Sequence, residues 1–290
     1  MKRDSGKPDK QSAASEPAGA GSQAQSAQAA FTSYAAPLVD HAIELAHAVR
    51  DDTSPEALHQ LRVSLRRLRS LWWAFHPLLE EAENRRQRAL FKYLASAAGK
   101  TRDWDIVIEL LSTEGSGAQA MTPRLSEVRD DALRTSRETL ANADVKHLLR
   151  DALAGASKEL NTAHERVPLR KFAATRVDAA QHSLKKRMKR ANRAKRSDYP
   201  ALHEVRKAAK KVRYLLDFFE PVLKGGHKPT IKRLKRIQKR FGALNDVVAS
   251  EALVRDQSGL LTGLDPGAAL AWLDRERKRR VRKAAALLSK

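Results

Sequence analysis

The chain has 290 residues, with 56 Lys and Arg against 34 Asp and Glu, and its formal net charge is +22. A charge of this size disfavours self-association and favours polyanionic partners. The apolar fraction of 42% is enough for a hydrophobic core, and the absence of cysteine excludes disulfides and thiolate chemistry. The sequence has no secretory signal and no run of about 18 apolar residues that would span a membrane, which predicts a soluble, cytoplasmic protein.

The chain divides into a tail and a helical region. Residues 1–30 are rich in Ser, Ala, Gln and Gly, which predicts a disordered, low-complexity tail. From about Phe31 onward, apolar residues recur at the three- and four-residue steps of amphipathic helices. One such series is Leu58, Leu61, Leu65, Leu68 and Trp72. Proline and glycine breaks separate the segments, so the sequence predicts an all-α fold of roughly eight to ten helices.

Two pairs of segments in the helical region match each other. Residues 58–79 match residues 202–223 after a shift of 144 positions, which aligns a histidine, several basic residues and a proline. Residues 99–103 (GKTRD) match residues 242–246 (GALND) after a shift of 143. Self-similarity at a fixed separation indicates a repeated structural unit.

The repeat predicts two copies of a unit of about 140 residues. Their boundary falls near residue 167, which gives repeat one at 31–167 and repeat two at 168–290. Two such units usually pack about a pseudo-two-fold axis. We therefore expect equivalent faces of the two copies to meet.

One side of each matched helix carries a basic stripe. At about 100° per residue, the residues of each stripe lie in a narrow sector beside the apolar face. The stripes are His59, Arg62, Arg66 and Arg69 in the first copy, and His203, Arg206, Lys210 and Arg213 in the second. Ten helical residues rise about 15 Å, so one stripe is long enough to contact several charges of an extended anion.

A basic stripe on a single helix is commonly its solvated face, and this interpretation competes with anion binding. Solvated faces usually mix the two signs of charge at i,i+4 spacing. Residues 58–76 and 205–216, however, contain no Asp or Glu. Because dense like charges repel one another and the pattern occurs twice, we favour an anion-binding surface.

Other basic residues are weaker candidates for this surface. Lys92 in the first copy matches Lys235 in the second, and Lys239 lies on the same helical face as Lys235. Arg102 either points into the surface or pairs with the neighbouring Asp103. Sequence spacing leaves these two alternatives open.

The histidines and aspartates of the matched segments also have competing interpretations. A histidine near a helix start is commonly a capping or packing residue. Because His59 and His203 precede the arginines on the same face, we favour hydrogen bonding to the anion, with the ring as an imidazolium in the anion's field. Asp103 and Asp246 each follow a glycine and are predicted to cap a helix.

Motifs for catalysis and metal binding are missing from the sequence. It has no phosphate-binding Gly-rich loop, no HExxH and no GxSxG. No carboxylate pair is placed for acid–base chemistry or for two magnesium ions, and no metal-ligand spacing accompanies the histidines. The sequence therefore predicts a binding protein that is not an enzyme and has no cofactor.

Nucleic acid is one candidate polyanion. Proteins that bind single strands interleave aromatic and basic residues so that bases stack, but aromatic residues make up only 5% of this chain. Trp73 and Tyr214 project near the basic stripes, yet neither has an aromatic residue at the matching position of the other copy. A bundle of helices can, however, bind a duplex backbone through charge alone. Non-specific nucleic-acid binding is therefore the alternative function.

The string from His59 to Arg69, its second copy from His203 to Arg213, and the two Gly-x-x-(Arg/Asn)-Asp elements resemble the CHAD family, the conserved histidine α-helical domain. The resemblance covers residues 31–290. It implies two four-helix bundles with pseudo-two-fold symmetry, whose basic faces line a central groove or pore that binds inorganic polyphosphate. The chain is similar to stand-alone members of the family, which associate with polyphosphate granules. Asn245 departs from the pattern, because the first copy has Arg102 at that position.

The resemblance and the stripes together predict non-catalytic polyphosphate binding at granules in the cytoplasm, without a membrane partner. The sequence leaves open the oligomeric state, the preferred chain length and the role of the tail. The predicted polyphosphate-binding residues are His59, Arg62, Arg66, Arg69, Lys92, Arg102, His203, Arg206, Lys210, Arg213, Lys235 and Lys239.

Overall fold

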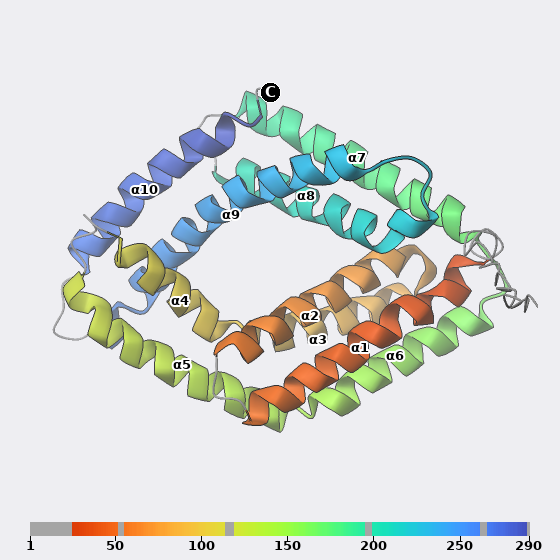
Figure 1. The fold of residues 1–290 in the computed structure, drawn as a ribbon, viewed down its shortest axis with the longest axis horizontal. Helices are drawn as coiled ribbons and strands as arrows, with labels where there is room; N and C mark the ends of the chain where they lie inside the picture. Colours follow the sequence, from red (N-terminus) through yellow and green to blue (C-terminus); the bar gives the residue numbers. More distant parts are fainter. Residues whose placement is uncertain (1–24, 52–54, 114–118, 195–198, 262–265, 289–290) are drawn as a thin grey trace, which may run out of the picture.

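The computed structural model describes residues 25–51, 55–113, 119–194, 199–261 and 266–288. These residues form ten α-helices, joined in part by short 3-10 turns, and no β-strand (Figure 1). The helices are α1 (Ala27–Asp51), α2 (Pro55–Phe75), α3 (Glu81–Ala97), α4 (Lys100–Leu111), α5 (Thr122–Asn142), α6 (Val145–Thr162), α7 (Leu169–Arg193), α8 (Tyr199–Phe219), α9 (Lys228–Asp256) and α10 (Gly267–Ala285). The predicted all-α fold is confirmed.

Helix α1 begins earlier than the sequence predicted. Residues 27–30, which were assigned to the disordered tail, are helical, and both Ala27 and Ala30 are fully buried. Their small side chains resemble those of a low-complexity tail in composition, but they fit a tightly packed helix contact. The remaining residues of the predicted tail, 1–24, lie outside the described residues.

Helices α2 and α8 are the central pair of the fold. Each is 21 residues long, and they begin 144 positions apart. A 3-10 turn follows each of them, η2 (His76–Leu78) with Pro77 and η4 (Glu220–Val222) with Pro221. Proline lacks an N–H group and clashes with the preceding turn, so it ends an α-helix. In Figure 1, α1 and α3 lie beside α2, whereas α7 and α9 lie beside α8.

An aromatic cluster holds the C-terminal ends of α2 and α8 together. Phe75 and Phe219 occupy equivalent positions in the two copies, are fully buried, and have ring centroids 5.7 Å apart. The ring of Phe172 in α7 lies 5.3 Å from Phe75 and 6.0 Å from Phe219. Aromatic pairs at such separations stabilise a core beyond simple burial. This packing makes the helices that carry the basic stripes neighbours.

The hydrophobic residues form two cores that do not separate at the repeat boundary. The larger core draws on α1, α2, α3, α6, α7, α8 and the first half of α9. In the smaller core, Trp104 and Val107 of α4 share a cluster with Val247 of α9 and Leu273 of α10. Each core thus contains residues of both predicted repeats. The division into two pseudo-symmetric four-helix bundles stays a prediction.

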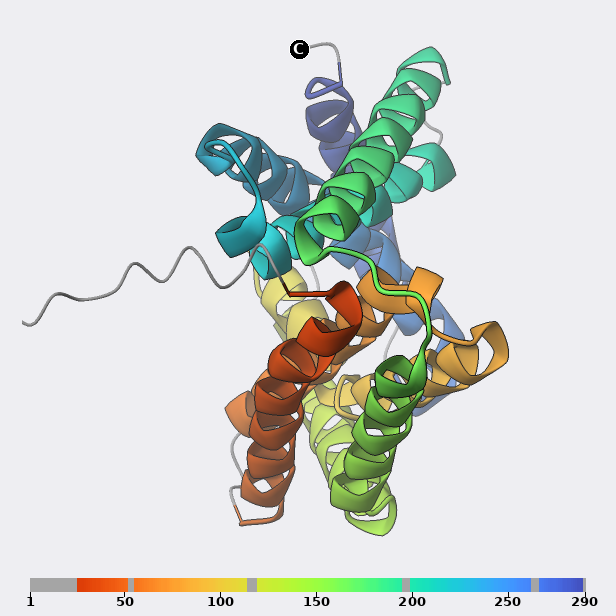
Figure 2. The same ribbon diagram turned by 90° about the vertical axis from the view of Figure 1, so that its right-hand side faces the viewer.

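The first helices of the two halves start side by side (Figure 2). The Ala27 amide donates to the Val167 carbonyl at 2.7 Å, and the Leu169 amide donates to the Gln25 carbonyl at 2.9 Å. These bonds satisfy amide groups at the starts of α1 and α7 that have no partner within their own helices. None of the helices in the described residues is both long enough and apolar enough to cross a membrane.

Candidate polyanion-binding site

The basic stripes of α2 and α8 face each other where the two helices pack. Arg66 of α2 interacts electrostatically with Arg62 and Arg69 of its own stripe and with Arg206 of α8. Lys210 of α8 in turn has Arg62 and Arg66 of α2 among its charged neighbours. The two stripes therefore form one cationic surface that spans both halves of the chain.

Arg66, Arg206 and Lys210 form the centre of this surface. All three side chains are half-buried, and none forms a salt bridge with a carboxylate of the described residues. Within the same residues, the Nε of Arg206 is buried without a hydrogen-bond partner. Buried polar groups without partners destabilise a fold, and unpaired buried charges do so more strongly.

Burial and mutual repulsion change the proton affinity of the central cations. Burial lowers the pKa of Arg66, and the charges of Arg62 and Arg206 lower it further. Burial, together with the charges of Arg66, Arg206, Arg213 and Arg62, lowers the pKa of Lys210 from 10.5 to about 7. Near neutral pH, the ammonium group of Lys210 is therefore poised to lose its proton, whereas the arginines remain charged.

A cleft of about 560 Å³ opens beside this centre, between α2, α4, α8 and α9. Five of the predicted site residues line it, together with both aspartates of the Gly-x-x-x-Asp elements. The lining residues that bear charge or a polar group are His59, Arg62, Arg66, Arg102, Asp103, Arg206, Asn245, Asp246, Ser250 and Asp256. Both halves of the chain thus contribute to a single concave surface.

Arg62 is fixed in place by the junction between α3 and α4. Its Nη1 donates to the Gly99 carbonyl at 2.8 Å and to Asp103 Oδ1 at 3.1 Å. A Cβ atom at Gly99 would lie 1.9 Å from that same Nη1. Only glycine therefore allows the guanidinium to approach the backbone here, which explains the glycine in the first Gly-x-x-x-Asp element.

The prediction that Asp103 and Asp246 each cap a helix is wrong, because neither lies at an N-cap position. Asp103 lies in the first turn of α4, but its side chain binds Arg62, and the N-cap residue Gly99 has no side chain to cap the helix. Asp246 lies inside α9, which runs without a break from residue 228 to 256. Burial raises the pKa of Asp246, although the charges of Arg206 and Arg280 act against this rise.

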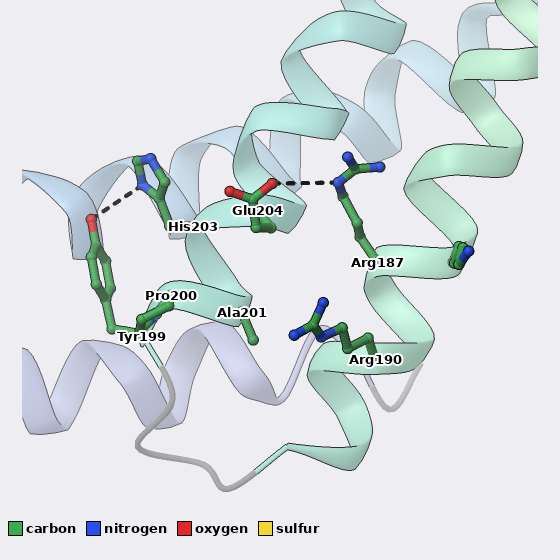
Figure 3. Close-up of a pocket in the computed structure, with 8 residues that line it drawn as sticks. Arg187, Arg190, Tyr199, Pro200, Ala201, His203 and Glu204 are labelled. Carbon is green, nitrogen blue, oxygen red and sulfur yellow. Dashed lines mark hydrogen bonds and ion pairs between the residues drawn. The ribbon is translucent and has the colours of Figure 1, made fainter.

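The two histidines line different cavities. His59 lines the cleft, and its buried Nδ1 has no hydrogen-bond partner within the described part of the chain. His203 lines a separate pocket of about 630 Å³ between α7 and α8, where its Nδ1 lies 3.2 Å from the hydroxyl of Tyr199 (Figure 3). Burial lowers the pKa of His203, and the charges of Lys207 and Arg206 lower it further. Without a bound anion, His203 is therefore neutral near pH 7.

The remaining predicted residues do not line the cleft, and they include Lys210, which lies beside it in the central group of cations. Arg69 extends the surface toward Arg88 of α3, whose pKa is lowered by burial and then by Arg69. Arg213 forms a 3.7 Å ion pair with Asp217. Three lysines, which the structure does not bring to the cleft, are exposed on α3 and α9: Lys92, Lys235 and Lys239.

Cations cover the two aromatic rings near the stripes. Arg176 of α7 and Lys211 of α8 lie over the Trp73 ring, at 4.8 and 4.7 Å from its centroid. Arg213 lies 5.1 Å from the centroid of Tyr214. The contribution of Arg176 was not predicted, because it comes from a helix whose sequence contains many scattered basic residues. Only the tertiary packing of α7 against the end of α2 singles it out.

No cluster of three or more His, Asp or Glu side chains that could hold a metal ion occurs in the described ranges.

Comparison with known proteins agrees with this geometry. The family model of the CHAD domain matches residues 33–255. The crystal structure of the CHAD domain from the plant Ricinus communis matches with a TM-score of 0.78 and 22% identity, covering 91% of this chain and 92% of that one. PptA from Streptomyces chartreusis matches with a TM-score of 0.57 and 16% identity, covering 91% and 96%. The curated proteins include no match to the sequence. Because the family model covers most of the chain, the protein belongs to the CHAD domain family.

Proposed function

We propose that this protein binds inorganic polyphosphate, without catalysis, in the cleft where α2 and α8 meet. The family is known for polyphosphate binding, and CHAD domains are generally binding modules rather than enzymes. One observation carries the proposal for this chain: Arg66, Arg206 and Lys210 face one another, half-buried, and none of them forms a salt bridge within the described residues, although Asp246 acts on Arg206 and Lys210 from α9. Such an arrangement favours an anion with several closely spaced charges.

Electrostatics supports a polyanion over isolated ions. Each central cation loses hydration by burial and is repelled by its neighbours, so the free protein holds unfavourable electrostatic energy at this site. A linear chain of phosphates would offset several of these charges at once through charge-assisted hydrogen bonds. The Nε of Arg206 and the Nδ1 of His59 are buried without a hydrogen-bond partner in the described residues, a cost that contact with such a ligand would remove if the site opened locally to admit it.

The aromatic environment favours polyphosphate over single-stranded nucleic acid. Base stacking requires an open aromatic face, but cations already lie over the rings of Trp73 and Tyr214. A ligand without bases needs no such face. Association with polyphosphate granules in the cytoplasm is part of the proposal, because granules present long polyphosphate chains to a binding module of this kind.

Competition binding tests this function. Labelled long-chain polyphosphate is displaced by unlabelled polyphosphate, duplex DNA or single-stranded DNA at equal phosphate concentration, between about 50 and 200 mM salt. We expect polyphosphate to displace the label far better than either DNA at every salt concentration. Equal displacement by DNA, fading in parallel as salt rises, would replace the proposal with non-specific binding of polyanions.

The site is tested with the double variant Arg66→Gln/Lys210→Gln. The matched control is Lys146→Gln/Lys158→Gln, which removes the same charge from exposed positions of α6. We expect the first variant to lose at least about 100-fold in polyphosphate affinity, since each charged hydrogen bond contributes about 1.5–3 kcal/mol, while the control changes little. Thermal unfolding should show that the first variant is at least as stable as the wild type, because it removes repulsion.

A further inference from the structure

The surface beside Trp73 has a second concentration of positive charge, outside the cleft. A cavity of about 240 Å³ lies between the end of α2 and the facing sides of α7 and α8. Its charged and aromatic lining consists of Trp73, Arg176, Arg187, Glu204, Lys207 and Lys211, and alanines form much of the remaining wall. Four cations and one carboxylate thus surround a space the size of a few phosphate groups.

Several of these cations are already held in place by the protein. Arg176 donates from Nε to the Ala74 carbonyl at 2.9 Å and from Nη2 to the Trp73 carbonyl at 3.0 Å, which fixes it at the C-terminal end of α2. Arg187 and Lys207 both pair with the single carboxylate of Glu204, and Arg187 Nε lies 3.5 Å from Glu204 Oε2. Figure 3 shows the contact between Arg187 and Glu204. One carboxylate cannot neutralise both of them.

Lys211 is the cation without a compensating charge. Its ammonium lies over the Trp73 ring, and it forms no salt bridge with any carboxylate of the described residues. The charged groups with the largest effect on it are Arg187, Arg88, Arg176 and Lys207, all of them cations, and Glu204 is the carboxylate that shares the cavity. Lys211 is exposed to solvent on one side, but its partial desolvation lowers its pKa, and these four cations lower it further. An anion in the cavity would relieve this repulsion.

We propose that the cavity beside Trp73 is a second phosphate-binding site, separate from the cleft, which binds a compact phosphate group carrying at least two negative charges. Arg176, Arg187 and Lys211 supply the hydrogen-bond donors, and the Trp73 ring positions the two cations above it. The group has two chemically equivalent sources: a small free phosphate such as pyrophosphate, or the end of a polyphosphate chain.

Further cations connect the cavity with the cleft. Arg66 neighbours Arg69, Arg69 neighbours Arg88, and Arg88 neighbours Lys211. These cations, on α2, α3 and α8, lie close enough to influence one another and occupy the region between the cleft and the cavity. Binding of the end of a polyphosphate chain in the cavity depends on the proposed function. Binding of a free small phosphate does not.

Titration of the full chain with pyrophosphate, followed by tryptophan fluorescence and calorimetry, tests the site directly. We expect a fluorescence change that disappears in Trp73→Phe, and affinity at least about tenfold weaker in Lys211→Met/Arg187→Gln, a loss typical of one charged hydrogen bond. The exposed control Lys146→Gln/Lys158→Gln should bind pyrophosphate like the wild type. Calorimetry of the cleft variant Arg66→Gln/Arg206→Gln measures any pyrophosphate held in the cleft, and this variant should keep the fluorescence change reported by Trp73. Pyrophosphate binding that depends on the cleft residues and not on Lys211 and Arg187 would overturn the proposal.

The two sources are separated by chain length. If the cavity takes the end of a chain, long polyphosphate should lose affinity in Lys211→Met/Arg187→Gln, while tripolyphosphate held in the cleft should not. If it takes only free phosphate, long-chain affinity should be unchanged and pyrophosphate affinity should fall. Failure of polyphosphate to outcompete DNA would reject the proposed function but leave the pyrophosphate result intact, so the two failures are distinguishable.

Discussion

Helices α2 and α8 carry the same basic stripe, but equivalent residues in the two stripes have different hydrogen-bond partners. Arg62 of α2 is held by the Gly99 carbonyl and Asp103, whereas its equivalent Arg206 has a buried Nε without a partner in the described residues. His203 lies against Tyr199, whereas His59 has an unpartnered Nδ1. Arg62 is already bound within the protein and shapes the surface, whereas the buried Nε of Arg206 and Nδ1 of His59 would gain a partner only from a ligand that reaches them.

A second difference lies in the equivalent positions 66 and 210. Arg66 stays charged at any physiological pH, because a guanidinium does not lose its proton in proteins. Lys210 occupies the matching place on α8 with an amine whose pKa is about 7. The first copy therefore contributes a permanent charge to the centre of the site, and the second copy contributes a charge that depends on pH.

The largest expected effect comes from removing the free arginine. Arg206→Gln should weaken polyphosphate binding about 10- to 100-fold, because a charged hydrogen bond contributes about 1.5–3 kcal/mol. Arg62→Gln should weaken binding less but lower the melting temperature more, because it leaves the contacts with Gly99 and Asp103 unmade. Calorimetric binding and thermal unfolding of both variants measure the two effects. Equal losses of affinity would show that the hydrogen bonds of Arg62 to Gly99 and Asp103 do not reduce its contribution to polyphosphate binding.

The next effect is the pH dependence of binding. Lys210 faces Arg62 and Arg66 on α2, Arg206 and Arg213 on α8, and Asp246 on α9. Between pH 7 and pH 9, wild-type affinity for polyphosphate should fall about tenfold, because Lys210, whose pKa is about 7 in the free protein, loses its proton and with it an attraction to the anion. Lys210→Arg should keep its affinity over this range. A wild-type protein that binds equally well at both values would contradict a titrating Lys210.

Lys210 also makes the stability of the free protein depend on pH, but stability should rise with pH whereas affinity for polyphosphate should fall. The folded-state pKa of Lys210 lies at about 7, below its ordinary value of 10.5. Between these values the unfolded chain binds more protons than the folded protein, so the contribution of Lys210 to the free energy of unfolding rises with pH. In the absence of phosphate, Lys210→Arg should lose this rise. Chemical unfolding of both proteins at pH 7 and 9 measures it.

The sequence predicts the parts of the site that depend on local periodicity. The stripes, their helices and the prolines that end them follow from three- and four-residue spacing and from the repeat. The separate cavities of the two histidines do not, because they depend on which other helices pack beside each histidine: α4 and α9 beside His59, and α7 beside His203. Lys235 and Lys239 match the basic pattern but lie exposed on α9, since periodicity gives the face of a helix and not its neighbours.

The aligned glycines Gly99 and Gly242 also have different surroundings that the sequence does not predict. Substituting them gives the smallest expected effect, a change in the free energy of unfolding. Gly99 separates α3 from α4 and contacts Arg62, whereas Gly242 lies inside the continuous α9 with no atom within 4 Å of a Cβ placed there. Gly99→Ala should destabilise the fold by about 1–3 kcal/mol through crowding. Gly242→Ala should stabilise it by up to about 1 kcal/mol, since alanine favours a helix interior. Denaturant unfolding measures both changes.

A double-variant cycle identifies the cause of the Gly99 effect. Truncating Arg62 removes the guanidinium that a Cβ at Gly99 would strike, so Gly99→Ala should be much less destabilising in an Arg62→Ala background than in the wild type. A coupling above about 0.5 kcal/mol between the two changes is expected for groups in contact. No coupling would mean that the backbone at the α3–α4 junction, and not Arg62, requires a glycine at position 99. The hydrogen bonds of Arg62 to Gly99 and Asp103 would then not be the reason for the glycine.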